Sequence, residues 1–129
     1  MANRARDWFA QAESDLGMAE LARGNHRHDW ACFAAQQAAE KAVKALHLHL
    51  GQEAWGHVVA RLLDELPTAP SPDLIERGMV LDNFYVSSRI PNGHPEGAAY
   101  EHYGSIQSDE ALKHAGAIVE FVRAEMAGA

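Results

Sequence analysis

An arginine and a histidine separated by four residues are the side chains of this sequence best suited to chemistry. Arg89 and His94 flank a short run of turn-forming residues. Cleaving RNA without a metal needs a base that titrates near neutral pH, and histidine supplies one. It also needs a fixed cation on the phosphate, whose charge grows in the transition state, and the planar guanidinium of arginine suits that role. The pair therefore predicts a catalytic site in which Arg89 holds a phosphate and His94 moves a proton.

The same two residues also have a purely structural interpretation. Arg89 would then cap the end of a helix, and His94 would simply be exposed in a loop. A lone Arg-x4-His pair often arises by chance. Pro91, Gly93 and Pro95 stiffen this segment, so helical spacing does not give the distance between the two side chains. Both interpretations stay open on the sequence alone.

Nearby polar residues are candidates for substrate binding. Asn92 could bond a phosphate or a sugar, although Asn after a proline more often makes a turn. Tyr85 could flank the site, although its helical spacing from Leu81 favours a core position with a solvated hydroxyl. Tyr100 and Tyr103 could stack on bases, with packing of the loop as the alternative.

Composition limits the kind of protein this chain is. Its 129 residues suit one domain with one core, and we expect a single domain over residues 1–129. The formal net charge of −7 argues against an extended positively charged surface that binds nucleic acid. It still allows a small phosphate-binding site, or a partner protein that supplies positive surface. No apolar stretch approaches a membrane span, and no export signal is visible. With Cys32 as its one cysteine, the chain is expected to be cytoplasmic, and we interpret Cys32 as a core residue rather than a nucleophile.

The eight histidines do not predict a metal site. His26 and His28 lie in a predicted turn, and His47 and His49 point in opposed directions from a helix. There is no His-Glu-x-x-His motif, no paired Glu-x-x-His of di-iron bundles, and no glycine-rich phosphate loop. We therefore expect neither a metal nor another cofactor.

Helical periodicity runs through the chain, and no strand pattern competes with it. The sequence predicts an all-α, antiparallel bundle of four to five helices with a long loop between the last two. The predicted helices cover residues 4–23, 29–50, 56–66 and 72–86, and the last begins after a cap at Ser108. The first helix presents a core stripe of Trp8, Ala12, Leu16 and Ala19.

The second predicted helix is the most informative element. Asp29 is its expected N-cap, and alanines spread over more than half of its circumference. A helix that is apolar on so wide an arc packs on several sides, which predicts the central position in a bundle. We interpret Glu40 and Lys44 as a helix-surface pair, and His57 as a residue at the start of the next helix. The polar stripe of the second helix comprises Gln36, Glu40, Lys44 and His47.

Several segments together resemble one family of helical proteins. The run WACFAAQQAAEKAVKAL, from Trp30 to Leu46, resembles the second helix of small prokaryotic HEPN proteins. The resemblance covers nearly the whole chain, because other features fall in the same order as in that family: Trp8 and Asp15-Leu16, His57 ahead of Leu62-Leu63, Leu81-Asp82 before Tyr85, and then Arg89-Ile90-Pro91-Asn92.

This resemblance implies a bundle of four or five helices that usually dimerises. Many HEPN proteins are metal-independent endoribonucleases with an Arg-x4-6-His motif, which Arg89 and His94 match. Some are toxins whose partner is a minimal nucleotidyltransferase encoded beside them, and others have lost catalysis and act as binding or scaffold modules. One position departs from the toxins: some continue His-x-Tyr, where this chain has Glu96, an acid that would repel phosphate.

Two functions follow as expectations. The first is an endoribonuclease in which the Arg89 and His94 of each subunit of a homodimer face a shared cleft and cleavage leaves a 2′,3′-cyclic phosphate. The alternative is a non-catalytic helical module that binds a minimal nucleotidyltransferase, with or without a nucleotide. We expect a homodimer because the central helix offers more apolar surface than short neighbours can hide, and Trp30, Phe33 and Trp55 are candidates for the interface.

Overall fold

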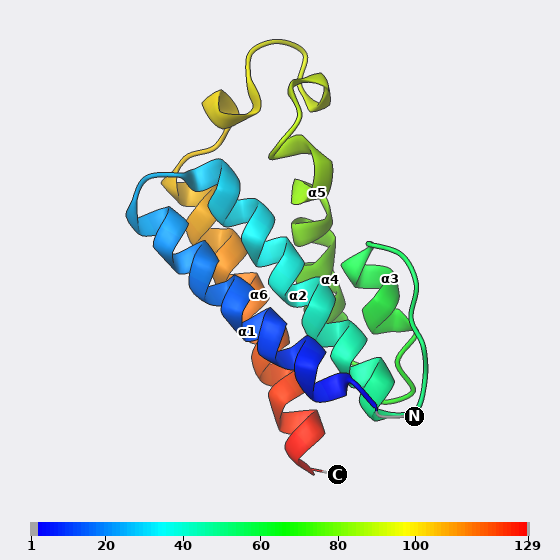
Figure 1. Cartoon of the computed structure of the whole chain (residues 1–129). Coiled ribbons are helices and arrows are strands. Elements are labelled where there is room, and N and C mark those ends of the chain that lie inside the picture. The colour runs from blue at the N-terminus through cyan, green and yellow to red at the C-terminus, as the bar shows by residue number, and fades with distance from the viewer. Residues whose placement is uncertain (1–2, 129) are drawn as a thin grey trace.

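The computed structural model describes residues 3–128, and all regular structure within them is helical. Three long helices, α1, α2 and α6, are joined by shorter ones (Figure 1). No helix in this part of the chain is long and apolar enough to cross a membrane. The elements are α1 Ala5–Gly24, α2 His28–His49, α3 Val59–Asp64, α4 Pro72–Asp82, α5 Phe84–Ser87, the 3-10 turns η1 Pro91–Gly93 and η2 Ala99–His102, and α6 Ser105–Gly128.

The second helix lies at the centre of the bundle, as its composition predicts. It packs against every other α-helix, with α1 antiparallel beside it and α6 against both (Figure 1). Alanine has no side chain beyond Cβ, so these helices approach closely. The α2 alanines with no solvent exposure are Ala31, Ala35, Ala38, Ala39, Ala42 and Ala45. The predicted helical bundle is therefore confirmed, with α2 as its axis.

The helix ends differ from the predicted ones in physically clear ways. Ser71 caps α4 as its type suggests, with Oγ accepting a hydrogen bond of 3.2 Å from the Leu74 N–H. Asp29, the predicted cap of α2, instead lies inside the first turn, because the helix begins at His28. Ser108, the predicted cap of the last helix, is buried one turn inside α6, where its hydroxyl lies 2.8 Å from Nδ1 of His28. Ser108 therefore joins two helices rather than starting one.

A carboxylate far away in the sequence sets the start of α3. Asp82, the last residue of α4, accepts hydrogen bonds from the N–H groups of Val59 at 2.6 Å and Ala60 at 3.1 Å. Burial raises the pKa of Asp82, and these two backbone hydrogen bonds oppose that shift. Because the cap acts at Val59, α3 begins there and not at Gly56 as predicted.

The predicted polar stripe of α2 and the predicted stripe of α1 are both partly wrong. Gln36, Glu40 and His47 are buried, because the chain from residue 52 to α3 covers that face of α2. His47 Nε2 donates to the Leu62 carbonyl at 2.8 Å. In α1, by contrast, a residue predicted to lie in the core is partly exposed. Trp8 is 37% exposed, although Ala12 and Ala19 are fully buried as predicted.

Cys32 lies in the core, in agreement with our interpretation. It has no solvent exposure, and burial, with a smaller contribution from Asp29, raises the pKa of its thiol to about 12. A thiol protonated at neutral pH is a poor nucleophile.

Candidate functional site

The predicted site lies at one end of the bundle, where the chain between α5 and α6 projects beyond the long helices (Figure 1). This segment folds back onto the last turn of α5. A Cβ atom on Gly93 would lie only 2.9 Å from Cα of Ser87, so only glycine fits at this approach. The buried Ser88 hydroxyl donates to the Phe84 carbonyl at 2.5 Å. Close backbone packing therefore fixes where the segment begins.

The guanidinium of Arg89 is held in place although the residue is exposed. Its Nε and Nη2 donate to the Tyr85 carbonyl at 3.0 and 2.7 Å. Its Cζ lies 4.2 Å from the centroid of the Phe33 ring and 5.3 Å from that of Tyr85. Arg89 does cap α5, as the structural interpretation expects. The cap uses only one side of the guanidinium, and no carboxylate among residues 3–128 pairs with it.

His94 is half-buried and fixed, which differs from the exposed loop position that the structural interpretation expects. Its Nε2 lies 2.7 Å from the Ser87 carbonyl oxygen. A carbonyl can only accept, so we assign the proton to Nε2. In the neutral ring this leaves the lone pair on Nδ1, which is the atom able to act as a base.

Arg89 and His94 are anchored on the same turn of the chain. Their partners are the carbonyls of Tyr85 and Ser87, two residues apart in α5. No hydrogen bond joins the two side chains to each other within the part of the chain that the structure describes. They are therefore placed independently on one short scaffold.

A third residue, His102, lies against His94, and it was not among the residues predicted from the sequence. Its ring stacks on that of His94 with centroids 4.0 Å apart and planes 1° apart. Its Nε2 donates to the carbonyl of Glu96 at 2.7 Å. The sequence holds one hint of this return, a glycine at Gly97, whose φ of +83° suits the reversal.

Tyr103 packs the loop onto α5, as the alternative to base stacking expects. Its hydroxyl lies 2.5 Å from Oγ of Ser87, which itself donates to the Asn83 carbonyl, so the tyrosine is the donor between them. Burial, the largest cause, raises the pKa of the Tyr103 hydroxyl. The ring also meets His94 edge to face, with centroids 5.8 Å apart. Tyr103 therefore supports the histidine rather than facing solvent as Tyr100 does.

The two predicted substrate-binding residues are placed differently. Asn92 is exposed in η1, next to both site residues, and its side chain has no hydrogen-bond partner among residues 3–128. Tyr85 is half-buried, and its ring stacks on His57 with centroids 4.8 Å apart. Tyr85 therefore supports Arg89 through its carbonyl and its ring.

A buried carboxylate lies behind this support. Glu40 accepts from Lys44 Nζ at 3.1 Å and from Gln36 Nε2 at 3.1 Å, and its Oε2 lies 3.1 Å from Nδ1 of His57. Our interpretation of Glu40 and Lys44 as a surface pair is wrong, because their side chains are only 5% and 14% exposed. The network reaches the site through His57, which stacks on Tyr85.

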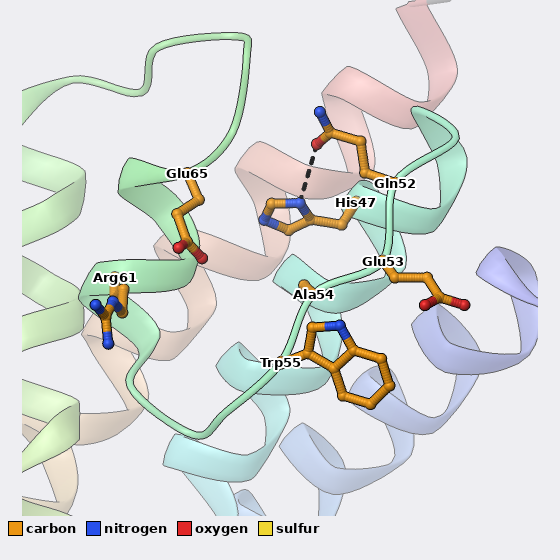
Figure 2. Close-up of a pocket in the computed structure, with 7 residues that line it drawn as sticks. All are labelled: His47, Gln52, Glu53, Ala54, Trp55, Arg61 and Glu65. Atoms are coloured by element: carbon orange, nitrogen blue, oxygen red, sulfur yellow. Dashed lines mark hydrogen bonds between the residues drawn. The ribbon is translucent and has the colours of Figure 1, made fainter.

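A pocket among the described residues lies away from this site. It has a volume of about 510 Å³ and opens beside the chain that follows α2 (Figure 2). None of the predicted site residues lines it; its lining is His47, Gln52, Glu53, Ala54, Trp55, Arg61 and Glu65. Within residues 3–128 no group of three or more His, Cys, Asp or Glu side chains is placed to hold a metal ion.

This all-helical architecture with an Arg-x4-His pair at one end defines a class of small helical-bundle proteins, and comparison with known proteins identifies it. The HEPN domain profile matches residues 5–125. The chain belongs to the HEPN family. A comparison with curated proteins found no match.

Solved structures agree with this assignment. The chain is similar to a protein from Thermus thermophilus, with 48% identity, a TM-score of 0.92, and coverage of 95% of this chain and 98% of that one. It is similar to an archaeal HEPN homologue, with 38% identity, a TM-score of 0.85, and coverage of 97% and 99%. It is also similar to a HEPN domain protein from Thermotoga maritima, with 29% identity, a TM-score of 0.77, and coverage of 94% and 98%.

Proposed function

We propose that this protein is a metal-independent endoribonuclease whose catalytic residues are Arg89 and His94. One observation carries the proposal: both side chains are anchored to carbonyls of α5, and the cation of Arg89 has no carboxylate partner among residues 3–128 although the chain has 18 acidic residues. A fixed, uncompensated cation and a fixed imidazole, both anchored to carbonyls of α5, are suited to a bound phosphate.

The reaction is an internal transesterification. Nδ1 of His94 removes the proton of a ribose 2′-OH, the 2′-oxygen attacks the adjacent phosphorus, and the P–O5′ bond breaks. The products are a 2′,3′-cyclic phosphate and a 5′-OH end. Arg89 stabilises the charge that builds on the non-bridging oxygens. Asn92, which is exposed in the segment between Arg89 and His94, would bond the phosphate or the sugar.

We further propose that the protein acts as a homodimer. An apolar patch of exposed Met18 and Trp30 with half-buried Phe33 and Ala34 lines a pocket of about 320 Å³ between α1 and α2. Phe33 is also the ring against which Arg89 lies. A second copy that covered this patch would bring two Arg89 side chains towards one cleft, and such a symmetric contact is the commonest form of association.

A second function has separate support. Trp55 is 79% exposed and, with Trp8 and Leu48, lines a further groove at the opposite end of α2 from Arg89. Large exposed aromatic side chains of this kind are typical of protein contact sites. A non-catalytic module that binds a minimal nucleotidyltransferase, with or without a nucleotide, would use this surface and would not need His94.

The test is cleavage of a mixed-sequence RNA by variants with matched controls. Arg89→Ala and His94→Ala are expected to lose cleavage, because general-base catalysis alone contributes roughly 10²–10⁴-fold. Arg6→Ala and His49→Ala remove the same side-chain types from positions outside the site and are expected to cleave normally. Products should carry 2′,3′-cyclic phosphate ends. Wild-type cleavage by the double variant Arg89→Ala/His94→Ala would refute the assignment of this site.

A further inference from the structure

Two histidines, not one, are fixed at the end of the bundle. The rings of His94 and His102 lie parallel, 4.0 Å apart between centroids. Each Nε2 is committed to a backbone carbonyl, that of Ser87 for His94 and that of Glu96 for His102. Neither Nδ1 has a hydrogen-bond partner among residues 3–128. Both rings are therefore held through Nε2, and each has Nδ1 free for a substrate.

The closeness of the rings favours one charge on the pair over two. Two imidazolium cations at this separation would repel each other. A pair that carries a single positive charge holds one neutral ring and one protonated ring. The other titratable or charged groups on the segments packed around it are Tyr85, Arg89, Glu96, Tyr100, Glu101, Tyr103 and, on α2, Asp29 and Cys32. Tyr103 stays neutral, since burial raises its pKa.

We propose that His102 is a second catalytic residue, the general acid that protonates the leaving 5′-oxygen. This inference rests on the proposed function, in which His94 is the base. Nδ1 of His94 accepts the 2′-OH proton as the O2′–P bond forms, and Nδ1–H of His102 donates its proton as the P–O5′ bond breaks. The proton count balances, because the pair begins and ends with one proton, and exchange with water restores its starting arrangement.

The geometry suits this division of work. The entering and leaving oxygens of an in-line displacement lie on opposite sides of phosphorus, separated by two P–O bonds. That span is comparable with the 4.0 Å between the ring centroids. His102 is the more exposed of the two rings, so a bound strand can reach it. A Cβ atom on Gly97 would lie 3.2 Å from Nε2 of His102, so the backbone of the loop lies close to the edge of the ring that carries Nε2.

The experiment separates a general acid from a residue that only supports His94. His102→Phe keeps an aromatic ring for stacking but has no proton to give. Two oligonucleotides with one ribonucleotide between randomised flanks serve as probes, one with the ordinary 5′-oxygen and one with a bridging 5′-sulfur. A thiolate leaves without protonation, because thiols are far stronger acids than alcohols.

We expect His102→Phe to lose roughly 10²–10⁴-fold on the oxygen substrate and to cleave the sulfur substrate at close to the wild-type rate. We expect His94→Ala to fail on both substrates, and His49→Phe to behave as wild type.

Two outcomes would overturn the role of His102. One is wild-type cleavage of the oxygen substrate by His102→Phe. The other is equal loss on both substrates by a variant with the wild-type melting temperature, which would make His102 a positioning residue. If His102→Phe does not fold, His102→Gln is tested in the same way. Failure of the proposed function looks different: wild-type protein would cleave neither substrate, or Arg89→Ala and His94→Ala would cleave both.

Discussion

Replacing Glu40 by alanine should destabilise the protein strongly, although the residue lies in what its sequence suggests is a surface stripe. The substitution leaves the ammonium of Lys44, only 14% exposed, without its carboxylate partner. It also leaves Gln36 without one of its acceptors. Breaking a buried ion pair by removing one partner costs about 3–5 kcal/mol, and the partial exposure of Lys44 favours the lower end. For a domain of this size a loss of about 3 kcal/mol corresponds to a fall of about 12 °C in melting temperature.

Thermal and urea unfolding of matched variants would check this estimate. Glu20→Ala removes an exposed carboxylate of α1 and should change stability by less than about 0.5 kcal/mol. The double variant Glu40→Met/Lys44→Met removes both charges and fills the space, so it should recover most of the loss, to within about 1.5 kcal/mol of wild type. A Glu40→Ala variant as stable as Glu20→Ala would show that the network is solvated and that our account of its burial is wrong.

Three further outcomes follow from the site and its proposed assembly. RNA cleavage should survive EDTA, and a loss that magnesium restores would show that the chemistry is wrong. Sedimentation at micromolar concentration should give a dimer, whereas a clean monomer would remove the shared cleft. Gly93→Ala should lower both cleavage and melting temperature, because its Cβ would lie 2.9 Å from Cα of Ser87. Gly17→Ala, with open space around it on α1, is the control and should stabilise the protein by about 0.5–1 kcal/mol. Equal melting temperatures for Gly93→Ala and wild type would contradict the close approach.

Periodicity and composition were enough to predict the helical bundle and its central helix. The alanines of α2 work as a signal because small residues on many sides of a helix leave only one stable arrangement, with other helices packed around it. Cys32 follows from the same reasoning. The spacing of apolar residues along a helix predicts which side chains share a face. In a long helix such as α2, the side chains predicted to share a face do so in the folded structure.

The same pattern could not say what covers each face. Glu40 and His47 lie on the polar side of α2, and their types alone indicate solvent. The chain after α2 turns back over them and supplies His57 and the Leu62 carbonyl as partners. Trp8 shows the converse, since nothing in the described chain buries it fully. Burial of a polar side chain depends on a partner from another element, which single-helix spacing does not contain.

The site shows this limit most sharply. Arg-x4-His spacing made Arg89 and His94 the candidate residues, but the contacts that hold their side chains come from segments outside the motif. Phe33 of α2 supports the guanidinium, Ser87 holds the imidazole, and His102 returns through a loop that only glycine at two positions allows. A sequence motif in a loop therefore predicts which residue types are present. The path of the backbone determines which of their side chains come into contact. Here the backbone path brings the ring centroid of His102 to 4.0 Å from that of His94, so the catalytic unit we propose has three residues. Substitutions at Gly93 should therefore lower RNA cleavage as directly as substitutions in the motif itself.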